Sequence, residues 1–437
     1  MRLIRSVTKL VIPIFLLVLL SSISAYAQEI VVNYKFLETT VVDAKDRPVE
    51  GAVVETVGFP KETQETFRTD RNGRLPKGLP VATGHINTIG FKVSKPGYFS
   101  YEDLGTIRDP FNSGLPQSIK LELLPVPKTP DERAAAGAEQ RKREFLLACK
   151  KGDSAGVRKL LEAGLDPNLT TSDLRGVPGQ KNIPAIIWAA VSGDGETVTT
   201  LLAAGANVRN KGSAANKALI VYLQGDYWSR LSGTESEAQI AAARRNYDSG
   251  ARSLIEAGAD QNALSIEEGR TSLMLCSTRC TVETIKKLLE NNVPVNAKDK
   301  NGATALVDAI SSRNPAIVNL LLEAGANPNE IFYDSEYVCS TALVRAVEVD
   351  SLTILRTLIN HKADINLACR NGETVLTHSV RSGHVPAVKM LLELGADVKG
   401  KQGERAIGIT KLRQTNDEWA QQIIDLLVAA GAPRSND

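Results

Sequence analysis

The chain has 437 residues, and 43% of them are hydrophobic, which is enough apolar material for the cores of two or three domains. Its 52 basic and 50 acidic residues leave a formal net charge of only +2. This balance gives no global field that would draw the chain to nucleic acid or to an anionic membrane surface, so neither is expected as a partner.

A secretory signal peptide is predicted over residues 1–27. Three basic residues, Arg2, Arg5 and Lys9, precede an apolar run at 10–20, and Ala25-Tyr26-Ala27 then forms an A-x-A cleavage site. The apolar run is too short for a comfortable membrane span. We therefore expect a mature chain that is periplasmic or secreted and is not inserted in a membrane. An uncleaved anchor is the alternative.

Residues 28–125 carry the pattern of a small all-β sandwich. Segments rich in β-branched residues are separated by turn signals, among them Thr69-Asp70-Arg71-Asn72-Gly73. Many short strands with turns between them are typical of two packed sheets. The strands are expected at 31–36, 51–56, 89–93 and 119–123.

Several of these segments resemble the carboxypeptidase regulatory-like domain, which is a transthyretin-like sandwich. The resemblance rests on the residues at 42–44 (VDA), 48–53 (PVEGAV), 69–73 (TDRNG) and 93–98 (VSKPGY). That family carries no catalytic residues, so the resemblance implies none here. A plain immunoglobulin-like sandwich is the competing interpretation.

A linker helix is predicted over residues 126–142. Pro125, Pro127 and Pro130 mark a boundary after the β-rich part. From Asp131 to Arg143, an alanine-rich polar stretch favours a helix that runs into the next domain. We expect the segments on either side of this linker to fold separately.

One phrase, Leu320–Asn329 (LLLEAGANPN), organises residues 143–437. Val318, Leu321 and Leu322 fall at i, i+3 and i+4 and form one apolar stripe on a helix. Gly325 supplies the left-handed residue that ends the helix, and the proline at 328 keeps it from resuming. Related phrases begin at Leu160, Leu201, Leu254, Leu288, Leu358, Leu391 and Leu426.

The spacing of these phrases sets the architecture. From 288 to 321 is 33 residues, from 321 to 358 is 37, from 358 to 391 is 33, and from 391 to 426 is 35. A period near 33 built from a turn and two helices is the ankyrin period. A first helix precedes each phrase: in one copy Asn301-Gly302 forms the turn, Thr304 is placed to cap the helix, and an apolar stripe starts at Leu306.

Residues 143–437 thus resemble the ankyrin-repeat family and are interpreted as an all-α solenoid of eight units with finger turns. The Thr-Pro-Leu-His signature of the family is reduced here to Thr304-Ala305-Leu306-Val307, Thr341-Ala342-Leu343-Val344 and Thr374-Val375-Leu376-Thr377. These copies lack both the proline and the histidine, which weakens capping without changing the fold.

Three steps exceed the period, and the longer segments are where a partner site is expected. The additional residues fall in Thr170–Asn182, in Gly225–Ser249 and in Glu330–Tyr337. Binding energy at protein interfaces is concentrated in aromatic and arginine side chains. For Gly225–Ser249, the competing interpretation is a longer helix pair that packs its own aromatics. The partner-binding candidates are Arg175, Tyr227, Trp228, Phe332, Tyr333 and Tyr337.

The five cysteines offer one pair that could bridge. Cys276 aligns with Ala309 and is interpreted as a small buried residue, and its i, i+4 spacing from Cys280 on one helical turn is unfavourable for a disulfide. Cys339 and Cys369 fall in neighbouring fingers and form the pair that could bridge. No CxxC or nearby histidine accompanies any cysteine, so no metal ion is expected.

The sequence contains no HExxH, P-loop or GxSxG motif, and none of its four histidines is paired with a nucleophile in a motif. We therefore expect no catalytic site, no cofactor and no enzyme. The predicted function is an exported scaffold or regulator that binds a protein partner through the solenoid. The alternatives are an envelope-surface or carbohydrate adhesin that uses the β-sandwich, and an enzyme with a non-obvious site.

Overall fold

A computed structural model describes residues 34–43, 47–57, 66–75, 79–82, 89–95, 101–106, 118–123, 127–171, 182–210, 213–225, 236–265, 268–335, 338–369, 371–399, 401–412 and 418–432. The predicted signal peptide, residues 1–27, lies outside them. The chain divides into two compact parts. The N-terminal part is Met1–Ile107 with Pro116–Pro125, and the C-terminal part is Arg108–Leu115 with Val126–Asp437.

The described strands of the N-terminal part form two small sheets, with strand orders β4-β1-β7 and β3-β2-β5-β6. β1 runs antiparallel to β4 and parallel to β7, whereas the neighbours in the second sheet are antiparallel. The β-sandwich and its resemblance to the carboxypeptidase regulatory-like domain stay predictions. The strands are β1 (Tyr34–Asp43), β2 (Val53–Val57), β3 (Thr66–Arg68), β4 (Leu79–Ala82), β5 (Ile89–Ser94), β6 (Tyr101–Thr106) and β7 (Ser118–Leu123).

A tight turn after β3 is fixed by one hydroxyl and one glycine. The Thr69 hydroxyl donates to the Val49 carbonyl (2.6 Å) and accepts from the Ala52 N–H (2.9 Å). Gly73 has φ +68°, and a Cβ at this position would come within 2.3 Å of the Val41 carbonyl oxygen. A residue larger than glycine therefore cannot occupy the end of this turn without moving β1.

The described residues of the C-terminal part form helices and one hairpin. The helices are α2 (Pro130–Lys151), α3 (Ser154–Glu162), α4 (Ala185–Ser192), α5 (Gly195–Ala203), α6 (Ala218–Gln224), α7 (Glu237–Glu256), α8 (Ser272–Arg279), α9 (Val282–Glu290), α10 (Ala305–Ser311), α11 (Pro315–Glu323), α12 (Ala342–Glu348), α13 (Leu352–Asn360), α14 (Val375–Arg381), α15 (Val385–Glu393), α16 (Lys401–Leu412) and α17 (Glu418–Ala429). A short 3-10 helix, η3 (Ala215–Lys217), precedes α6, and the hairpin is β8 (Ile331–Ser335) with β9 (Val338–Thr341).

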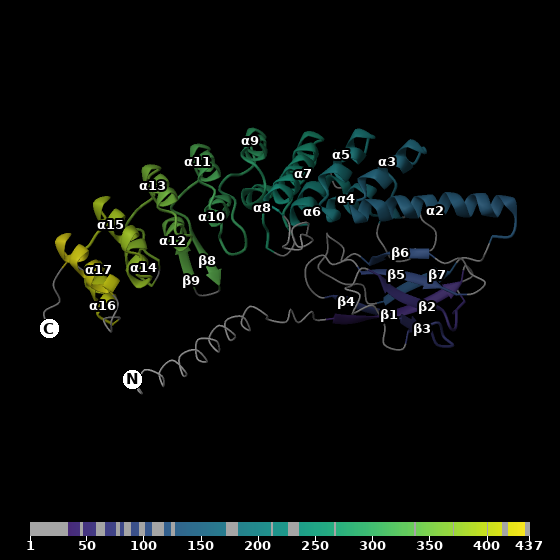
Figure 1. The fold of residues 1–437 in the computed structure, drawn as a ribbon, viewed down its shortest axis with the longest axis horizontal. Helices are drawn as coiled ribbons and strands as arrows, with labels where there is room; N and C mark the ends of the chain where they lie inside the picture. The colour runs from purple at the N-terminus through teal and green to yellow at the C-terminus, as the bar shows by residue number, and fades with distance from the viewer. Residues whose placement is uncertain are drawn as a thin grey trace, which may run out of the picture. The chain divides into compact units, whose positions relative to one another are not determined.

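These helices form eight consecutive pairs, from α2/α3 to α16/α17, which we call repeats 1 to 8. The first member of each pair is its first helix and the other its second helix. The first helices pack on one another in the order α2, α4, α6, α8, α10, α12, α14, α16. The second helices form a parallel row (Figure 1). We call the segment that leads from one repeat into the first helix of the next a finger. Each first helix after α2 therefore has a finger at its N-terminal end.

The apolar stripe predicted for α11 is confirmed. Val318 and Leu321 are fully buried, Leu322 is nearly so, and the helix ends at Glu323, two residues before Gly325 at φ +87°. In the corresponding helices of repeats 4, 6 and 7, the equivalent residues Leu288, Leu358 and Leu391 are also fully buried. Burial of one stripe against the first helix and the neighbouring repeats supplies most of the stability of such short helices.

Successive repeats are also joined by asparagine side chains. Asn296 accepts from the Asn327 N–H (2.8 Å) and donates to the Gly325 carbonyl (3.0 Å). Asn329 repeats the pattern one step later with the Asp364 N–H (2.7 Å) and the Lys362 carbonyl. Each asparagine thus satisfies backbone groups of the following repeat, which would otherwise be left without partners at a helix end.

Much of the described additional segment of repeat 3 is helical, since α7 begins at Glu237, as the competing interpretation of a longer helix pair predicted. Three other details differ from the sequence-based expectations. The predicted linker helix is not separate, because α2 runs from Pro130 to Lys151 without a break. In the last repeat the buried residue is Leu427, one position after the predicted Leu426. Leu160 is only half-buried, because repeat 1 has no preceding repeat to cover it.

Two disulfides are present among the described residues. Cys339 is bonded to Cys369, which joins the fingers before α12 and α14. Cys276 is bonded to Cys280, contrary to the expectation from their helical spacing. Cys280 is the C-cap that follows the end of α8 at Arg279 and is not a residue of the helix, and the two Cα atoms lie 4.7 Å apart. Cys149 is a buried free thiol.

Candidate functional site

Polar side chains recur at two positions of consecutive first helices. Thr304, Thr341 and Thr374 occupy the N-caps of α10, α12 and α14, the first helices of repeats 5, 6 and 7. The residues four and seven positions later lie one helical turn apart and therefore share a face. All their polar members are half-buried or exposed. We call this set the first-helix stripe: Asp308, Ser311, Arg345, Glu348, His378 and Arg381.

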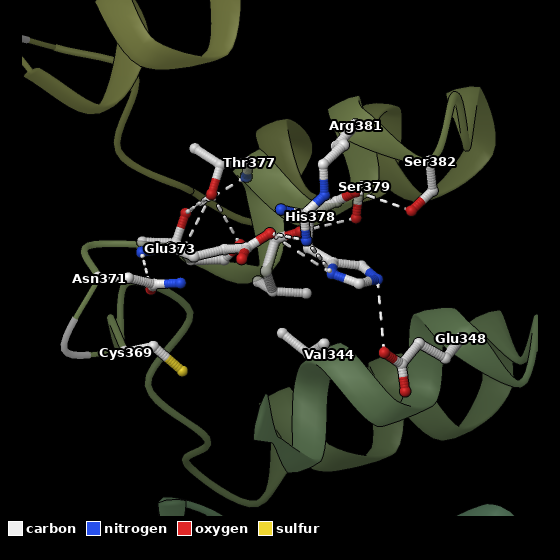
Figure 2. A network of polar contacts seen from close by, with 12 residues as sticks. Val344, Glu348, Cys369, Asn371, Glu373, Thr377, His378, Ser379, Arg381 and Ser382 are labelled. Atoms are coloured by element: carbon white, nitrogen blue, oxygen red, sulfur yellow. Dashed lines mark hydrogen bonds and ion pairs between the residues drawn. The ribbon is translucent and has the colours of Figure 1, made fainter. Parts of the chain in front are cut away.

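The densest contacts of the stripe surround His378 (Figure 2). Its Nε2 lies 3.7 Å from Glu348 Oε1 of α12, and its Nδ1 lies 3.6 Å from Glu373 Oε1 of the preceding finger. Arg381 forms an ion pair with Glu373 and approaches Nδ1 at 3.2 Å. Glu348 in turn pairs with Arg345 at 3.1 Å. Repeats 6 and 7 are thereby connected through one charged network.

Burial and charge act in opposite directions on His378. Only 15% of its side chain is exposed, and burial lowers the pKa of His378 below its usual value of 6.5. The nearby Glu348 and Glu373 carboxylates raise this pKa, and Arg381 lowers it. The ring is therefore neutral at pH 7 and lies close to groups that can stabilise its charged form.

Repeat 5 contributes a second charged pair to the stripe. Asp308 lies 2.7 Å from Arg270, which stands in the finger before α8. Burial raises the pKa of Asp308 to about 6, although the Arg270 charge acts in the opposite direction. The pair therefore links repeats 4 and 5 and leaves a carboxyl group that titrates just below neutral pH.

The lengthened finger beside the stripe is the β8–β9 hairpin. Phe332 is only 1% exposed, and the Arg345 guanidinium lies 5.4 Å from its ring centroid, within range of a cation–π contact. Phe332 was predicted as an exposed anchor for a partner. It instead packs inward, so we withdraw it from the candidate set. Tyr333, the next residue, is half-buried and stays a candidate.

The other four candidates cannot be placed. Arg175, Tyr227 and Trp228 lie outside the described residues, and so does Tyr337. In the additional segment of repeat 3, the described aromatic is Tyr247, which is fully buried. Its ring stacks on Tyr222 with centroids 4.9 Å apart. For this residue the competing interpretation, aromatics packed within their own repeat, is the one observed.

Sequence reasoning missed the stripe because it searched the longer segments for aromatics. The signal was present in the repeat itself: counting four and seven residues from each capping threonine locates every member. Residues at equal phase in consecutive repeats come to lie side by side in a solenoid. Charged or polar residues at a phase next to the buried positions were therefore the available indication.

The described residues show no arrangement typical of a metal centre or a membrane span. Among them, no group of three or more His, Cys, Asp and Glu side chains is placed to bind a metal ion. The same residues include no helix with the length and apolar character needed to cross a bilayer. What the stripe offers chemically is a row of charge-assisted hydrogen bonds on rigid helices.

Comparison with known families identifies the repeats. Residues 239–331 and 333–402 match the model for ankyrin repeats. This matched region contains most of α7 and extends to the start of α16, so it includes the whole first-helix stripe.

Curated relatives agree with this match. The chain is 29% identical over 174 residues to an ankyrin repeat protein of Escherichia coli, YahD. This alignment covers 39% of this chain and 84% of YahD. It is 32% identical over 126 residues (29% of the chain) to the ankyrin repeat, SAM and basic leucine zipper domain-containing protein 1 of Colobus guereza. It is 28% identical over 172 residues (38% of the chain) to the B-cell lymphoma 3 protein homolog of Mus musculus.

The last two alignments span only 26% and 38% of those relatives. The likeness therefore concerns the repeats and not the other domains of these proteins. The helix pairs, the spacing of their buried leucines and the family match lead to one conclusion: the C-terminal part of this chain contains a helical ankyrin-repeat region, which the family model matches over residues 239–331 and 333–402.

Proposed function

We propose that this chain is an exported scaffold or regulator that binds a protein partner through the first-helix stripe and the adjoining fingers. Ankyrin repeats are in general protein–protein interaction modules. The proposal concerns binding and not catalysis.

The observation that carries the proposal is the first-helix stripe. Its side chains recur at fixed positions in repeats 5, 6 and 7, and three of them, Asp308, Glu348 and His378, are held by contacts to a neighbouring repeat. A surface whose side chains are ordered before binding loses little entropy when a partner docks. Tyr333 stands in the finger next to Arg345 and supplies the amphipathic aromatic that such interfaces favour.

The proposed export rests on the predicted signal peptide and on the cysteine pairing. Four of the five cysteines are paired, as Cys276–Cys280 and Cys339–Cys369. Disulfides persist in oxidising compartments and are rare in a reducing cytosol. Both features are consistent with a periplasmic or secreted protein.

Site-specific photo-crosslinking tests the binding surface. A photoreactive residue in place of Ser311 stands exposed on the stripe, whereas the same residue in place of Glu323 stands exposed on a second helix. In the native compartment, the chain labelled at Ser311 should give a discrete crosslinked partner, and the chain labelled at Glu323 should not. Crosslinks from Glu323 alone would move the binding surface to the second helices.

Mass spectrometry tests the export. We expect a mature chain that begins at Gln28 and, after alkylation under denaturing but non-reducing conditions, carries one modified cysteine, Cys149. A full-length chain with five modified cysteines would contradict export.

A further inference from the structure

His378 lies among three charged side chains from three places in the chain. Arg381 belongs to the same helix, Glu373 to the finger before it, and Glu348 to the end of α12 (Figure 2). A guanidinium group can only donate hydrogen bonds. The 3.2 Å contact between Arg381 Nη2 and His378 Nδ1 therefore makes Nδ1 an acceptor. The neutral ring must carry its proton on Nε2, the nitrogen nearer Glu348.

A second proton, taken from solvent, has to bind Nδ1. The N–H formed there removes the acceptor that Arg381 uses, and it places a positive ring against a positive guanidinium. The same proton improves the contacts to Glu373 Oε1, at 3.6 Å from Nδ1, and to Glu348 Oε1, at 3.7 Å from Nε2. The charged ring thus competes with Arg381 for Glu373.

Arg381 is the member of this group that can move. Its side chain is 47% exposed, compared with 12% for Glu373 and 15% for His378. The backbone N–H of Glu373 is also bonded to the Asn371 side chain (3.0 Å), which fixes the finger at this point. Rotation of Arg381 into solvent therefore disturbs the least structure.

Three further charged or titratable groups on the elements around α14 have partners of their own. Arg345 on α12 pairs with Glu348 (3.1 Å), and Arg405 on α16 donates to the Asn371 carbonyl (2.7 Å). His384, at the start of α15, is bonded to Asp350 (2.7 Å). Within the described residues, none of these three contacts involves the ring of His378.

We propose that His378 is a proton-dependent switch for Arg381. With the ring neutral, Arg381 is paired with Glu373; with the ring protonated, Glu373 pairs with His378 and the guanidinium of Arg381 turns outward on the first-helix stripe. An outward guanidinium offers a fork of donors that suits a carboxylate, so acidification prepares the stripe for an acidic group of a protein partner. This last consequence rests on the proposed function, because it takes the stripe as the binding surface.

The titration range of the switch follows from its surroundings. Burial lowers the pKa of His378 below 6.5, while Glu348 and Glu373 limit how far it falls. The switch therefore operates on the acid side of neutrality, where an isolated histidine would already be half charged.

Histidine-selective NMR of the mature full-length chain tests the switch. Four histidines give four ring signals, and His378→Asn identifies the relevant one. We expect the neutral ring to show the Nε2–H tautomer. We also expect the Nε–H signal of Arg381 to change with the same midpoint as the His378 ring, towards faster exchange with solvent at low pH.

Three variants should move the pH midpoint of His378 upwards, downwards or hardly at all. Arg381→Gln removes the like charge beside Nδ1, so the midpoint of His378 should rise by roughly one pH unit, about a tenfold gain in proton affinity. Glu348→Gln should lower it. Arg381→Lys keeps the positive charge and should restore most of the wild-type midpoint. His384, bonded to Asp350, is the internal control, and its ring signals should be the same in every variant.

An Nδ1–H tautomer, a His378 midpoint that ignores Arg381→Gln, or an Arg381 signal that does not follow the ring would each overturn the switch. Normal His384 signals identify variants that are folded. Since no partner is needed, a negative result here leaves the proposed binding function intact. A failed crosslinking experiment likewise leaves the switch to be judged on its own titration.

Discussion

Leu321 and Glu323 are two positions apart on α11 and lie in opposite environments. Leu321 is fully buried, whereas Glu323 is exposed. We expect Leu321→Asp to destabilise the protein by several kcal/mol, because the carboxylate has no partner in the core. Glu323→Lys should change the free energy of unfolding by no more than about 0.5 kcal/mol. Urea unfolding of both variants checks this, and equal midpoints would show that the assigned helix face is wrong.

Asp308 should make stability depend on pH in an unusual direction. Its pKa of about 6 lies above the 3.8 of an ordinary Asp carboxyl, so between these values the folded chain binds a proton that the unfolded chain does not. The contribution of Asp308 to stability is therefore complete at low pH. It is lost as pH rises through 6, by up to about 3 kcal/mol.

The matched variant is Asp308→Asn, which cannot titrate. The free energy of unfolding of the wild type minus that of the variant should fall as pH rises from about 4 to about 6. The other carboxyl groups are common to both chains and cancel in this difference. A difference that stays flat across this range would mean that the Arg270 ion pair keeps Asp308 ionised throughout.

Single residues were the least predictable level of this structure. Phe332 and Tyr247 both lie in segments longer than the repeat period, and an aromatic there is equally compatible with a partner site and with local packing. The contacts in the folded chain show local packing in both cases: Arg345 covers Phe332, and Tyr222 stacks on Tyr247. Neither contact follows from spacing along the chain.

Among the elements, those built on the 33-residue period were predictable. The period gave the phase of α11, its buried stripe and its glycine stop. It failed where a helix is longer than the period predicts: α2 runs across the expected boundary at 142/143, and α7 begins at Glu237, within the additional segment of repeat 3. Helices propagate as long as the sequence allows, so a boundary inferred from domain logic does not end them. The period also did not predict that the lengthened finger before α12 forms the β8–β9 hairpin.

The β8–β9 hairpin should depend on its disulfide. Replacing Cys339 and Cys369 by serine removes a cross-link over 30 residues, for which we expect a loss of about 2–4 kcal/mol in the free energy of unfolding. Hydrogen exchange should quicken at the N–H of Tyr333, which bonds the Asn301 carbonyl (2.9 Å), while α10 stays protected. The variant that lacks Cys276 and Cys280 instead is the control and should keep the hairpin protected. Slow exchange in both variants would show that the hairpin is held by its backbone hydrogen bonds alone.

At the scale of the whole molecule, the chain consists of two compact parts, and the last change from one to the other along the sequence falls between Pro125 and Val126. We expect them to be independent folding units. Limited proteolysis should cut first between residues 124 and 129, ahead of the capping box that starts α2 at Thr129, and leave two resistant fragments. A chain with Asp131→Pro and Glu132→Pro, which opens the first turn of α2, should be cut further into this helix. First cuts between strands of the N-terminal part would contradict the division.

The disulfide between neighbouring fingers has a mechanical consequence. When a stack of repeats is pulled from its ends, repeats peel away one after another, because each is held by its neighbours alone. The bond between Cys339 and Cys369 carries the pulling force directly from one cysteine to the other. The chain between these two cysteines, which are 30 positions apart, is therefore not stretched, and it includes α12 and α13. At about 3.4 Å per extended residue, this segment withholds roughly 100 Å of contour length until the bond is reduced. Under tension, the middle of the solenoid would thus behave as a stop that limits how far the chain can be drawn out.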